Sequence, residues 1–209
     1  MRDLVCLVAD KNMAAALEGL LNRPRALGIR AIQSETIVHP RRDPGCFHEP
    51  IELLRGYRAD TGRAVVLLDR AWDGAPEGTA EDIEELIRGK LCSAGLGEWA
   101  EVVVIDPELE VWVFSDSPHV EEILGWTRRH PSLRPALESG GLWTSGAPKP
   151  LDPKAALDWA LHAVRKPRSS SIYRLLAECV GLERCQDRSF LRLKDILRQW
   201  FGTERDAGG

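Results

Sequence analysis

The most informative segment of the chain is Ala64-Val65-Val66-Leu67-Leu68-Asp69-Arg70-Ala71-Trp72-Asp73. A continuous apolar run of this length, ended by charged residues, is typical of a strand covered on both faces in a parallel sheet. Two further runs end in the same way, since residues 4–9 are followed by Asp10 and residues 102–105 by Asp106. In open α/β sheets, ligands bind beyond the carboxyl ends of the strands. We therefore predict that these acidic residues meet at one edge of a mainly parallel sheet.

Helical patterns separate the predicted strands. Asn12 can cap a helix that Pro24 stops, and a second strand is expected over residues 28–38. After a turn-rich loop at 39–48, a short helix over 50–57 leads into the central strand. This alternation of strands and helices predicts right-handed crossovers and an α/β fold.

The second half of the chain reads mainly as helices. Thr79-Ala80-Glu81-Asp82 resembles a capping box, and the apolar face of the helix it starts would hold Ile83, Leu86, Ile87 and Leu91. Further helices are predicted over 152–164, 171–180 and 190–200. The Gly-, Ser- and Pro-rich stretch at 139–150 predicts a boundary. We expect an α/β domain over 1–140 and a helical C-terminal region over 151–209 packed on it.

Composition indicates an ordinary globular protein. Of 209 residues, 44% are hydrophobic and 29% charged, so disorder is not expected. The formal net charge of −4 argues against a strongly basic nucleic-acid coat but allows a local basic groove. No apolar run approaches the length of a membrane span and no signal-peptide pattern opens the chain, so we expect a cytoplasmic protein. Five cysteines without CxxC spacing predict reduced thiols.

Several carboxylates at one sheet edge would hold a divalent cation. Mg²⁺ prefers oxygen ligands and keeps several waters, so two or three carboxylates near a phosphate are sufficient, and Mn²⁺ can take its place. Such an ion stabilises the charge that develops in phosphoryl transfer. Asp10, Asp69, Asp73 and Asp106 are therefore the candidate ligands at this edge. The alternative for Asp10 and Asp69 is a carboxylate that caps a loop at a strand end.

Two basic loops could contact phosphates. Arg41 and Arg42 follow the second predicted strand, and the planar guanidinium of arginine suits phosphate. Lys166 and Arg168, with the serines at 169–171, form a second basic and hydroxyl-rich loop that could close over the same substrate. The alternatives are a solvated loop for the first pair and charge balance at a helix C-terminus for the second.

The loop that contains His39, Cys46 and His48 offers a different chemistry. All three can bind zinc, but their spacing matches no standard finger and no fourth ligand is evident. A Cys46 and His48 nucleophile would also need an orienting residue that the sequence does not show.

The landmarks together resemble a known family. They are Asp10 and Asp69 at strand ends, the segment Glu108-Leu109-Glu110-Val111-Trp112-Val113-Phe114-Ser115-Asp116, and the tail from Lys166-Pro167-Arg168-Ser169-Ser170-Ser171 to Trp200. The chain resembles Toprim-like bacterial proteins that are found beside anti-phage defence genes and are related to RloB-type and OLD-type nucleases, and among them most a component of the methylation-associated defence system. The resemblance also favours a helix within residues 107–126.

The resemblance implies a Toprim-like fold with Mg²⁺ held by Asp10, Asp69 and Asp73. Glu108 and Glu110 would be the later acidic motif, and Asp10, Asp69 and Glu110 the catalytic residues. The chain departs from the family pattern twice. An aspartate replaces the usual glutamate after the first strand, and Asp69-x-x-x-Asp73 stands where the family has a DxD pair.

Two functions follow from this pattern. The first is an Mg²⁺-dependent phosphoryl-transfer enzyme, a nuclease of phage defence, with nucleic acid as substrate and other defence-system proteins as partners. The second is a catalytically silent recognition or assembly subunit of a multi-protein defence complex. The retained acidic strand ends favour the first, and the two departures favour the second.

Overall fold

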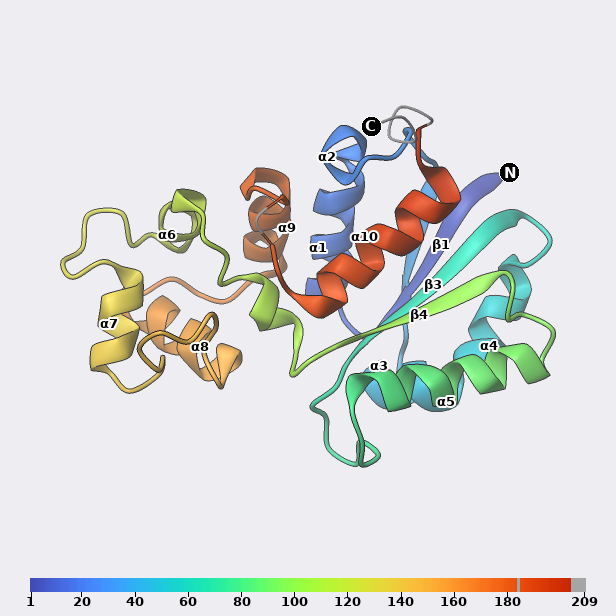
Figure 1. Ribbon diagram of the computed structural model, residues 1–209, viewed down its shortest axis with the longest axis horizontal. Coiled ribbons are helices and arrows are strands. Elements are labelled where there is room, and N and C mark those ends of the chain that lie inside the picture. The colour runs from blue at the N-terminus through green and yellow to red at the C-terminus, as the bar shows by residue number, and fades with distance from the viewer. Residues whose placement is uncertain (184, 204–209) are drawn as a thin grey trace.

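The sheet at the centre of the molecule is parallel throughout. The computed structural model describes residues 1–183 and 185–203. Its strands have the order β2-β1-β3-β4 (Figure 1). Their bounds are Arg2–Val8 for β1, Ser34–Val38 for β2, Thr61–Asp69 for β3 and Ala100–Ile105 for β4. The expected α/β fold with a mainly parallel sheet, flanking helices and a helical C-terminal region is confirmed.

The apolar runs of the sequence form the inner strands. Residues 4–8 of β1 and 64–68 of β3 are fully buried, as the continuous apolar pattern predicts for a sheet covered on both faces. Val8 at the end of β1 pairs with Leu67 of β3 and Val38 of β2, and Asp69 pairs with Ile105 of β4. The carboxyl ends of the strands therefore lie at one level.

Helices cover both faces of the sheet (Figure 1). On one face lie α1 (Lys11–Leu21), α2 (Pro24–Leu27), α9 (Ser170–Cys179) and α10 (Arg188–Phe201), with α9 packed on α1. On the other face lie α3 (Arg42–His48), α4 (Pro50–Leu54), the 3₁₀ turn η1 (Arg55–Tyr57) and α5 (Ala80–Ser93). No helix in these two described ranges is long and apolar enough to cross a membrane.

A smaller helical lobe lies at the end of the molecule toward which the strands point (Figure 1). It contains α6 (Pro118–Leu124), α7 (Leu133–Ser139) and α8 (Pro153–Ala163), and the 3₁₀ turn η2 (Leu109–Trp112) connects it to β4. The predicted boundary at 139–150 falls inside this lobe, where α7 contacts α8. The division into 1–140 and 151–209 stays a prediction, and its residues 184 and 204–209 lie outside the described part.

Three elements differ from the sequence-based expectation. The second strand is limited to Ser34–Val38, because Gly28 ends α2 in a left-handed conformation with φ +76°. The loop expected at 39–48 contains α3. The helix expected within 107–126 is divided into η2 and α6, because Pro118 starts α6 and the residue before a proline is disfavoured in helical geometry.

Two helix details were also wrong. Asp10, not Asn12, caps α1, since its Oδ1 accepts hydrogen bonds from the amides of Asn12 at 2.9 Å and Met13 at 2.8 Å. On α5 the capping box of Thr79 and Asp82 is confirmed. However, the predicted core residue Leu86 is 50% exposed, whereas Glu84 is 1% exposed.

Candidate acidic site at the strand ends

Asp10 and Asp69 lie on either side of the point where the sheet changes direction. From β1 the chain first moves outward to β2 and later crosses to β3 on the other side. At such a topological switch point the connections diverge and leave a crevice beyond the strand ends, where α/β proteins bind ligands. Asp10 lies two residues beyond Val8, the last residue of β1, and Asp69 is the last residue of β3. The fold thus brings together two of the predicted site residues.

Asp69 is partly buried and surrounded by negative charge. Its Oδ1 accepts a hydrogen bond from the amide of Leu109 at 2.9 Å. Burial is the main cause that raises the pKa of its carboxyl well above the usual value, and the charges of Asp43, Asp10 and Glu108 raise it further. Four carboxyl groups from four different segments therefore interact at this edge.

Sequence reasoning missed Asp43. It lies in the first turn of α3, and its Oδ1 accepts a hydrogen bond from the amide of Asp69 at 2.9 Å. Burial raises the pKa of Asp43, and the charge of Asp10 contributes to the rise. The rule that acidic residues after parallel strands mark a site, applied to the second strand, could have found it.

A close contact between His39 and Gly45 fixes the position of α3. A Cβ atom on Gly45 would lie 1.9 Å from the His39 Nδ1, so a larger residue does not fit. The same Nδ1 accepts a hydrogen bond from the Arg41 amide at 3.0 Å. These contacts fix the loop that carries Asp43 beside Asp69.

Glu108 and Lys154 add an ion pair at the rim. The Lys154 Nζ, on α8, lies 3.1 Å from the Glu108 Oε2. Glu108 is 8% exposed, while the side chain of Lys154 is 55% exposed. The bond to Glu108 is the main cause that raises the pKa of Lys154, with Asp69 among the further contributors. Lys154 thus brings a solvent-accessible cation next to the acidic cluster.

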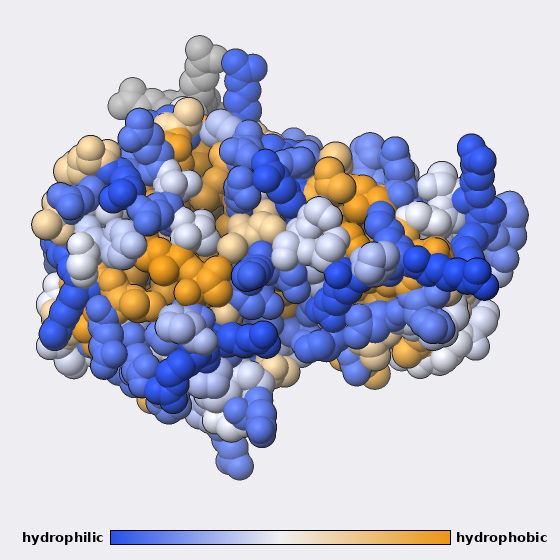
Figure 2. Space-filling view, turned by 180° about the vertical axis from the view of Figure 1, so that it is seen from behind, coloured by the Kyte–Doolittle hydropathy of each residue, from blue (hydrophilic) through white to orange (hydrophobic). Residues whose placement is uncertain are grey.

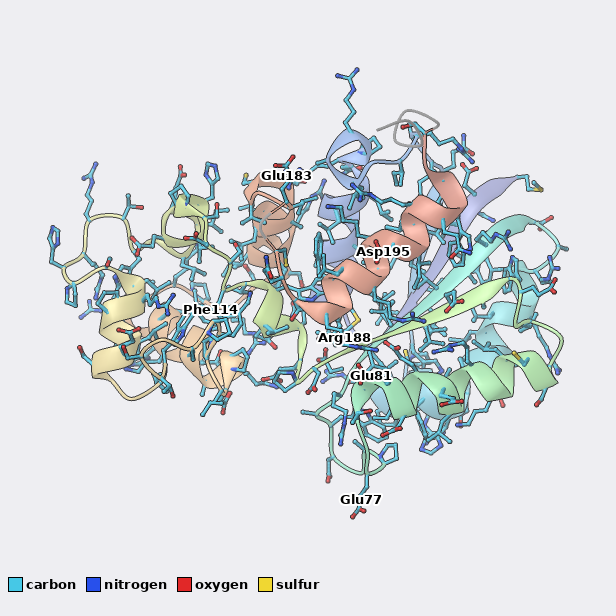
Figure 3. All side chains as sticks on the ribbon, in the orientation of Figure 1. Glu77, Glu81, Phe114, Glu183, Arg188 and Asp195 are labelled. Carbon is cyan, nitrogen blue, oxygen red and sulfur yellow. The ribbon has the colours of Figure 1, made fainter. Side chains whose placement is uncertain are left out.

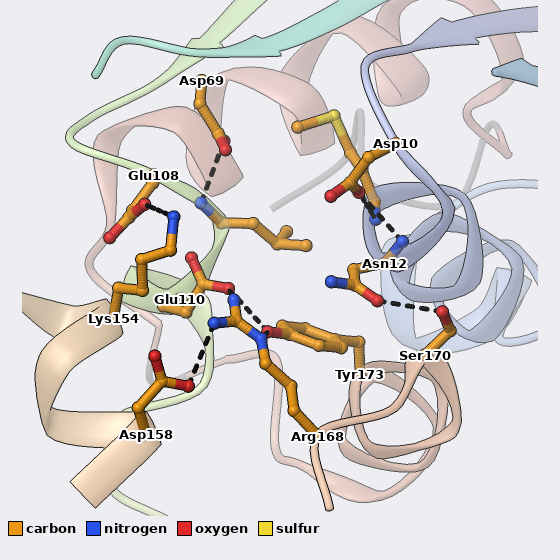
Figure 4. A network of polar contacts seen from close by, with 12 residues as sticks. Asp10, Asn12, Asp69, Glu108, Glu110, Lys154, Asp158, Arg168, Ser170 and Tyr173 are labelled. Carbon is orange, nitrogen blue, oxygen red and sulfur yellow. Dashed lines mark hydrogen bonds and ion pairs between the residues drawn. The ribbon is translucent and has the colours of Figure 1, made fainter. Parts of the chain in front are cut away.

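Glu110 is bound to Arg168 and Tyr173 below this cluster (Figure 4). Glu110 is 3% exposed and accepts a hydrogen bond from the Tyr173 hydroxyl at 2.5 Å. Arg168 forms an ion pair with Glu110 and a second one, of 3.1 Å, with Asp158 on α8. The predicted catalytic Glu110 and the predicted phosphate ligand Arg168 are therefore bound to each other.

The N-termini of α1 and α9 meet beside Asp10. The Ser170 Oγ donates to the Asn12 Oδ1 at 2.9 Å (Figure 4). The two helices approach closely at Gly19, where a Cβ atom would lie 2.6 Å from the Arg174 carbonyl oxygen, so the lack of a side chain allows this contact. The site is thus bordered by helix ends from both termini of the chain.

The remaining predicted residues are not members of this carboxyl cluster, although Arg42 adjoins it next to Asp43. Asp73 is exposed in the loop after β3. Arg41 is exposed and pairs with Glu49. Arg42 is exposed beside Asp43, with a left-handed φ of +51°. Lys166 donates to the carbonyl oxygen of Ile123 at the end of α6. Their roles as metal and phosphate ligands stay predictions.

The oxygen atoms at this site are of the kind that Mg²⁺ binds. Within residues 1–183 and 185–203, no three His, Cys, Asp or Glu side chains are grouped so as to hold an ion by themselves. Asp10 and Asp69 each use Oδ1 for backbone amides, and their second oxygens accept no hydrogen bond from the described residues. Because Mg²⁺ commonly takes one or two protein carboxylates plus phosphate and water, this pair fits an ion completed by a substrate.

The structure does not support the zinc and cysteine alternatives. His39 uses Nδ1 for the Arg41 amide, and Cys46 is fully buried. Burial raises the pKa of the Cys46 thiol, with the charges of Asp43 and Asp69 adding to the rise, so it stays protonated.

No protein-family model, curated protein or solved structure matches the chain.

Proposed function

We propose that the chain is an Mg²⁺-dependent phosphoryl-transfer enzyme of Toprim-like type, a nuclease that acts in anti-phage defence. The observation that carries this proposal is the partly buried Asp69 carboxyl, which interacts with Asp10, Asp43 and Glu108 at the topological switch point. Negative charge concentrated where α/β sheets bind ligands favours a bound cation.

Asp10 and Asp69 would hold the ion, together with a phosphate of the substrate. Bound there, Mg²⁺ stabilises the charge of the transferring phosphoryl group and promotes ionisation of the attacking water. Mn²⁺ can replace it. Asp43 keeps Asp69 in position through the backbone amide of that residue.

Basic side chains around the cluster would hold the nucleic-acid backbone. Lys154 is bound to Glu108, and the charge of Asp69 also acts on it. Its exposed side chain can exchange Glu108 for a phosphate oxygen. Arg42 is exposed next to Asp43, and its charge acts on that carboxyl. Glu110 and Arg168 act in this proposal as a support that joins η2, α8 and α9.

A second candidate is a catalytically silent Toprim-like subunit for recognition or assembly in a defence complex. The ion pair of Glu110 with Arg168 favours it, because both side chains are used for structure. The lack of a third ligand grouped with Asp10 and Asp69 within the described ranges favours it as well.

Calorimetric titration with Mn²⁺ and Mg²⁺, followed by cleavage assays on single- and double-stranded DNA and RNA, separates the two. For the enzyme, we expect cation binding and cleavage that are both lost in Asp69→Asn. Asp60→Asn is the matched control, since Asp60 is exposed and precedes β3, at the other end of that strand from Asp69. Absence of cation binding and of cleavage, with and without a nucleic-acid substrate, would contradict the enzyme and favour the silent subunit.

A further inference from the structure

The two edge strands of the sheet, β4 and β2, differ in whether their outward backbone groups have hydrogen-bond partners among the described residues. At the β4 edge, the Val104 amide donates to Glu84 Oε1 at 3.0 Å, and the Arg192 Nε donates to the Val102 carbonyl oxygen at 3.0 Å. Helix α10 packs along this strand. Side chains therefore satisfy backbone groups that an edge strand leaves free.

The β2 edge has no such cover. Gln33 accepts from the Leu4 amide and the His39 amide donates to Val8, so the odd-numbered residues of this segment bond to β1. In a parallel pair, the amides and carbonyls of the alternate residues, here Ser34, Thr36 and Val38, face outward. No described residue forms a hydrogen bond with these outward backbone groups.

The usual protection of an edge is also missing from β2. Charged side chains, prolines and bulges normally shield free edges from other chains. Glu35 carries the charge of this strand, but its carboxylate is held by Arg2 at 2.7 Å and by the Tyr57 hydroxyl at 3.2 Å. Val38 is 37% exposed. The back of the larger lobe carries apolar patches between polar residues (Figure 2).

Helix α1 forms one wall of a groove beside this edge. The groove is lined by Lys11, Ala14, Ala15 and Glu18 of α1 and by Ser34 and Thr36 of β2. The two alanines lie midway between a basic and an acidic residue. Such a face is complementary to itself when a second copy is turned by a two-fold rotation, because small residues meet at the axis and opposite charges meet on either side.

We propose that a second copy of this chain docks on the β2 edge, with the two β2 strands antiparallel around Thr36. Ser34 then lies opposite Val38 of the second copy, and each such pair exchanges two hydrogen bonds. Glu35 lies beside Ile37 of the second copy, so like charges are not opposed. Lys11 pairs with Glu18 of the second copy, and the sheet continues across the dimer with the acidic sites at opposite edges.

Glu18 has room for this second partner. It pairs with Arg174 of its own chain at 3.2 Å, and its side chain remains 55% exposed. A carboxylate has two oxygens with about four acceptor positions, so it can bind both cations.

Sedimentation equilibrium of the full chain tests the dimer through a charge exchange. We expect Lys11→Glu to weaken association by about tenfold, because two ion pairs become like-charge contacts. Glu18→Lys should do the same, and the Lys11→Glu, Glu18→Lys double variant should restore wild-type association. Recovery in the double variant shows that the single variants did not simply misfold.

A backbone variant adds an independent test. Val38→Pro removes an outward amide and should also weaken the dimer, whereas Leu191→Lys, at a 40% exposed position on α10 near the other edge, should leave it intact. The proposal is overturned if the wild-type chain stays monomeric at a concentration of about 100 micromolar. It is also overturned if the single charge reversals leave association unchanged.

Discussion

Glu84 on α5 and Asp69 at the end of β3 are both acidic residues at the sheet, but the charges around them are of opposite sign. Glu84 is bound by Arg188 at 2.9 Å and Arg192 at 3.0 Å. Figure 3 shows Arg188 beside Glu81, where the start of α10 meets the start of α5. Asp69 instead interacts with further carboxylates. Matched charge fixes α10 to the sheet, whereas unmatched charge costs stability and is the kind of arrangement found at functional sites.

The largest effect is expected on the matched side. Glu84→Ala should lower the free energy of unfolding by about 3 kcal/mol, because it leaves the Val104 amide without its acceptor and two arginines without their partner. Urea denaturation measures this change. Glu85→Ala is the control, since Glu85 is exposed on the same helix and should change stability by less than about 0.5 kcal/mol. Equal losses in both variants would end the contrast with Asp69.

The unmatched side should respond in the opposite direction. Asp69→Asn keeps an acceptor for the Leu109 amide but removes the repulsion, so we expect a gain of about 1–2 kcal/mol at pH 8 without divalent cations. Chemical denaturation of both proteins, with Asp73→Asn as control, measures it. A loss of stability in Asp69→Asn would show that favourable contacts of the Asp69 carboxylate outweigh the repulsion within the acidic cluster.

The pH dependence provides a sharper form of the same test. Since the pKa of Asp69 is raised on folding, the folded state binds this proton more tightly than the unfolded state does. The contribution of this proton to the free energy of unfolding is therefore complete below the unfolded pKa of about 3.8, and it is lost as the pH rises through the folded pKa. We expect the stability of the wild type relative to Asp69→Asn to fall over this range. A constant difference from pH 4 to pH 8 would contradict it.

The smallest effect concerns the exposed cation at the rim. Lys154→Met should destabilise the protein by only about 0.5 kcal/mol, because the lysine is 55% exposed and water screens its pairing with Glu108. If Lys154 holds phosphate, the same change should lower nucleic-acid binding much more than stability. Fluorescence anisotropy with Lys154→Arg as control distinguishes the two effects.

The sheet could be predicted from the sequence because its inner strands are continuous apolar runs. Asp10 and Asp69 could be placed for the same reason, since each follows such a run. Asp43 gives a weaker signal: it follows the second strand, but its neighbours Pro44 and Gly45 indicate a turn, and its hydrogen bond to a residue 26 positions away leaves no trace in the local pattern. The turn formers also concealed α3.

Glu84 shows the other limit of sequence reasoning. On a helix, a glutamate between Ile83 and Leu86 indicates a solvated face, and the apolar pattern predicts that Leu86 faces the core. Arg188, 104 residues along the chain, and Arg192 on the same helix reverse this by neutralising Glu84 in the interior. Patterns within one helix carry no information about charges that arrive from another element.

The hydrogen bond between Asn12 and Ser170 joins residues 158 positions apart, and it has a consequence for synthesis of the protein. All four strands and their aspartates leave the ribosome before α9 is made. Until then the apolar face of α1 that α9 covers is open to water and to chaperones. A product truncated before residue 170 would carry every sheet aspartate, yet it would expose this face and lack the hydrogen bond from Tyr173 to Glu110. Completion of the acidic site is therefore coupled to completion of translation.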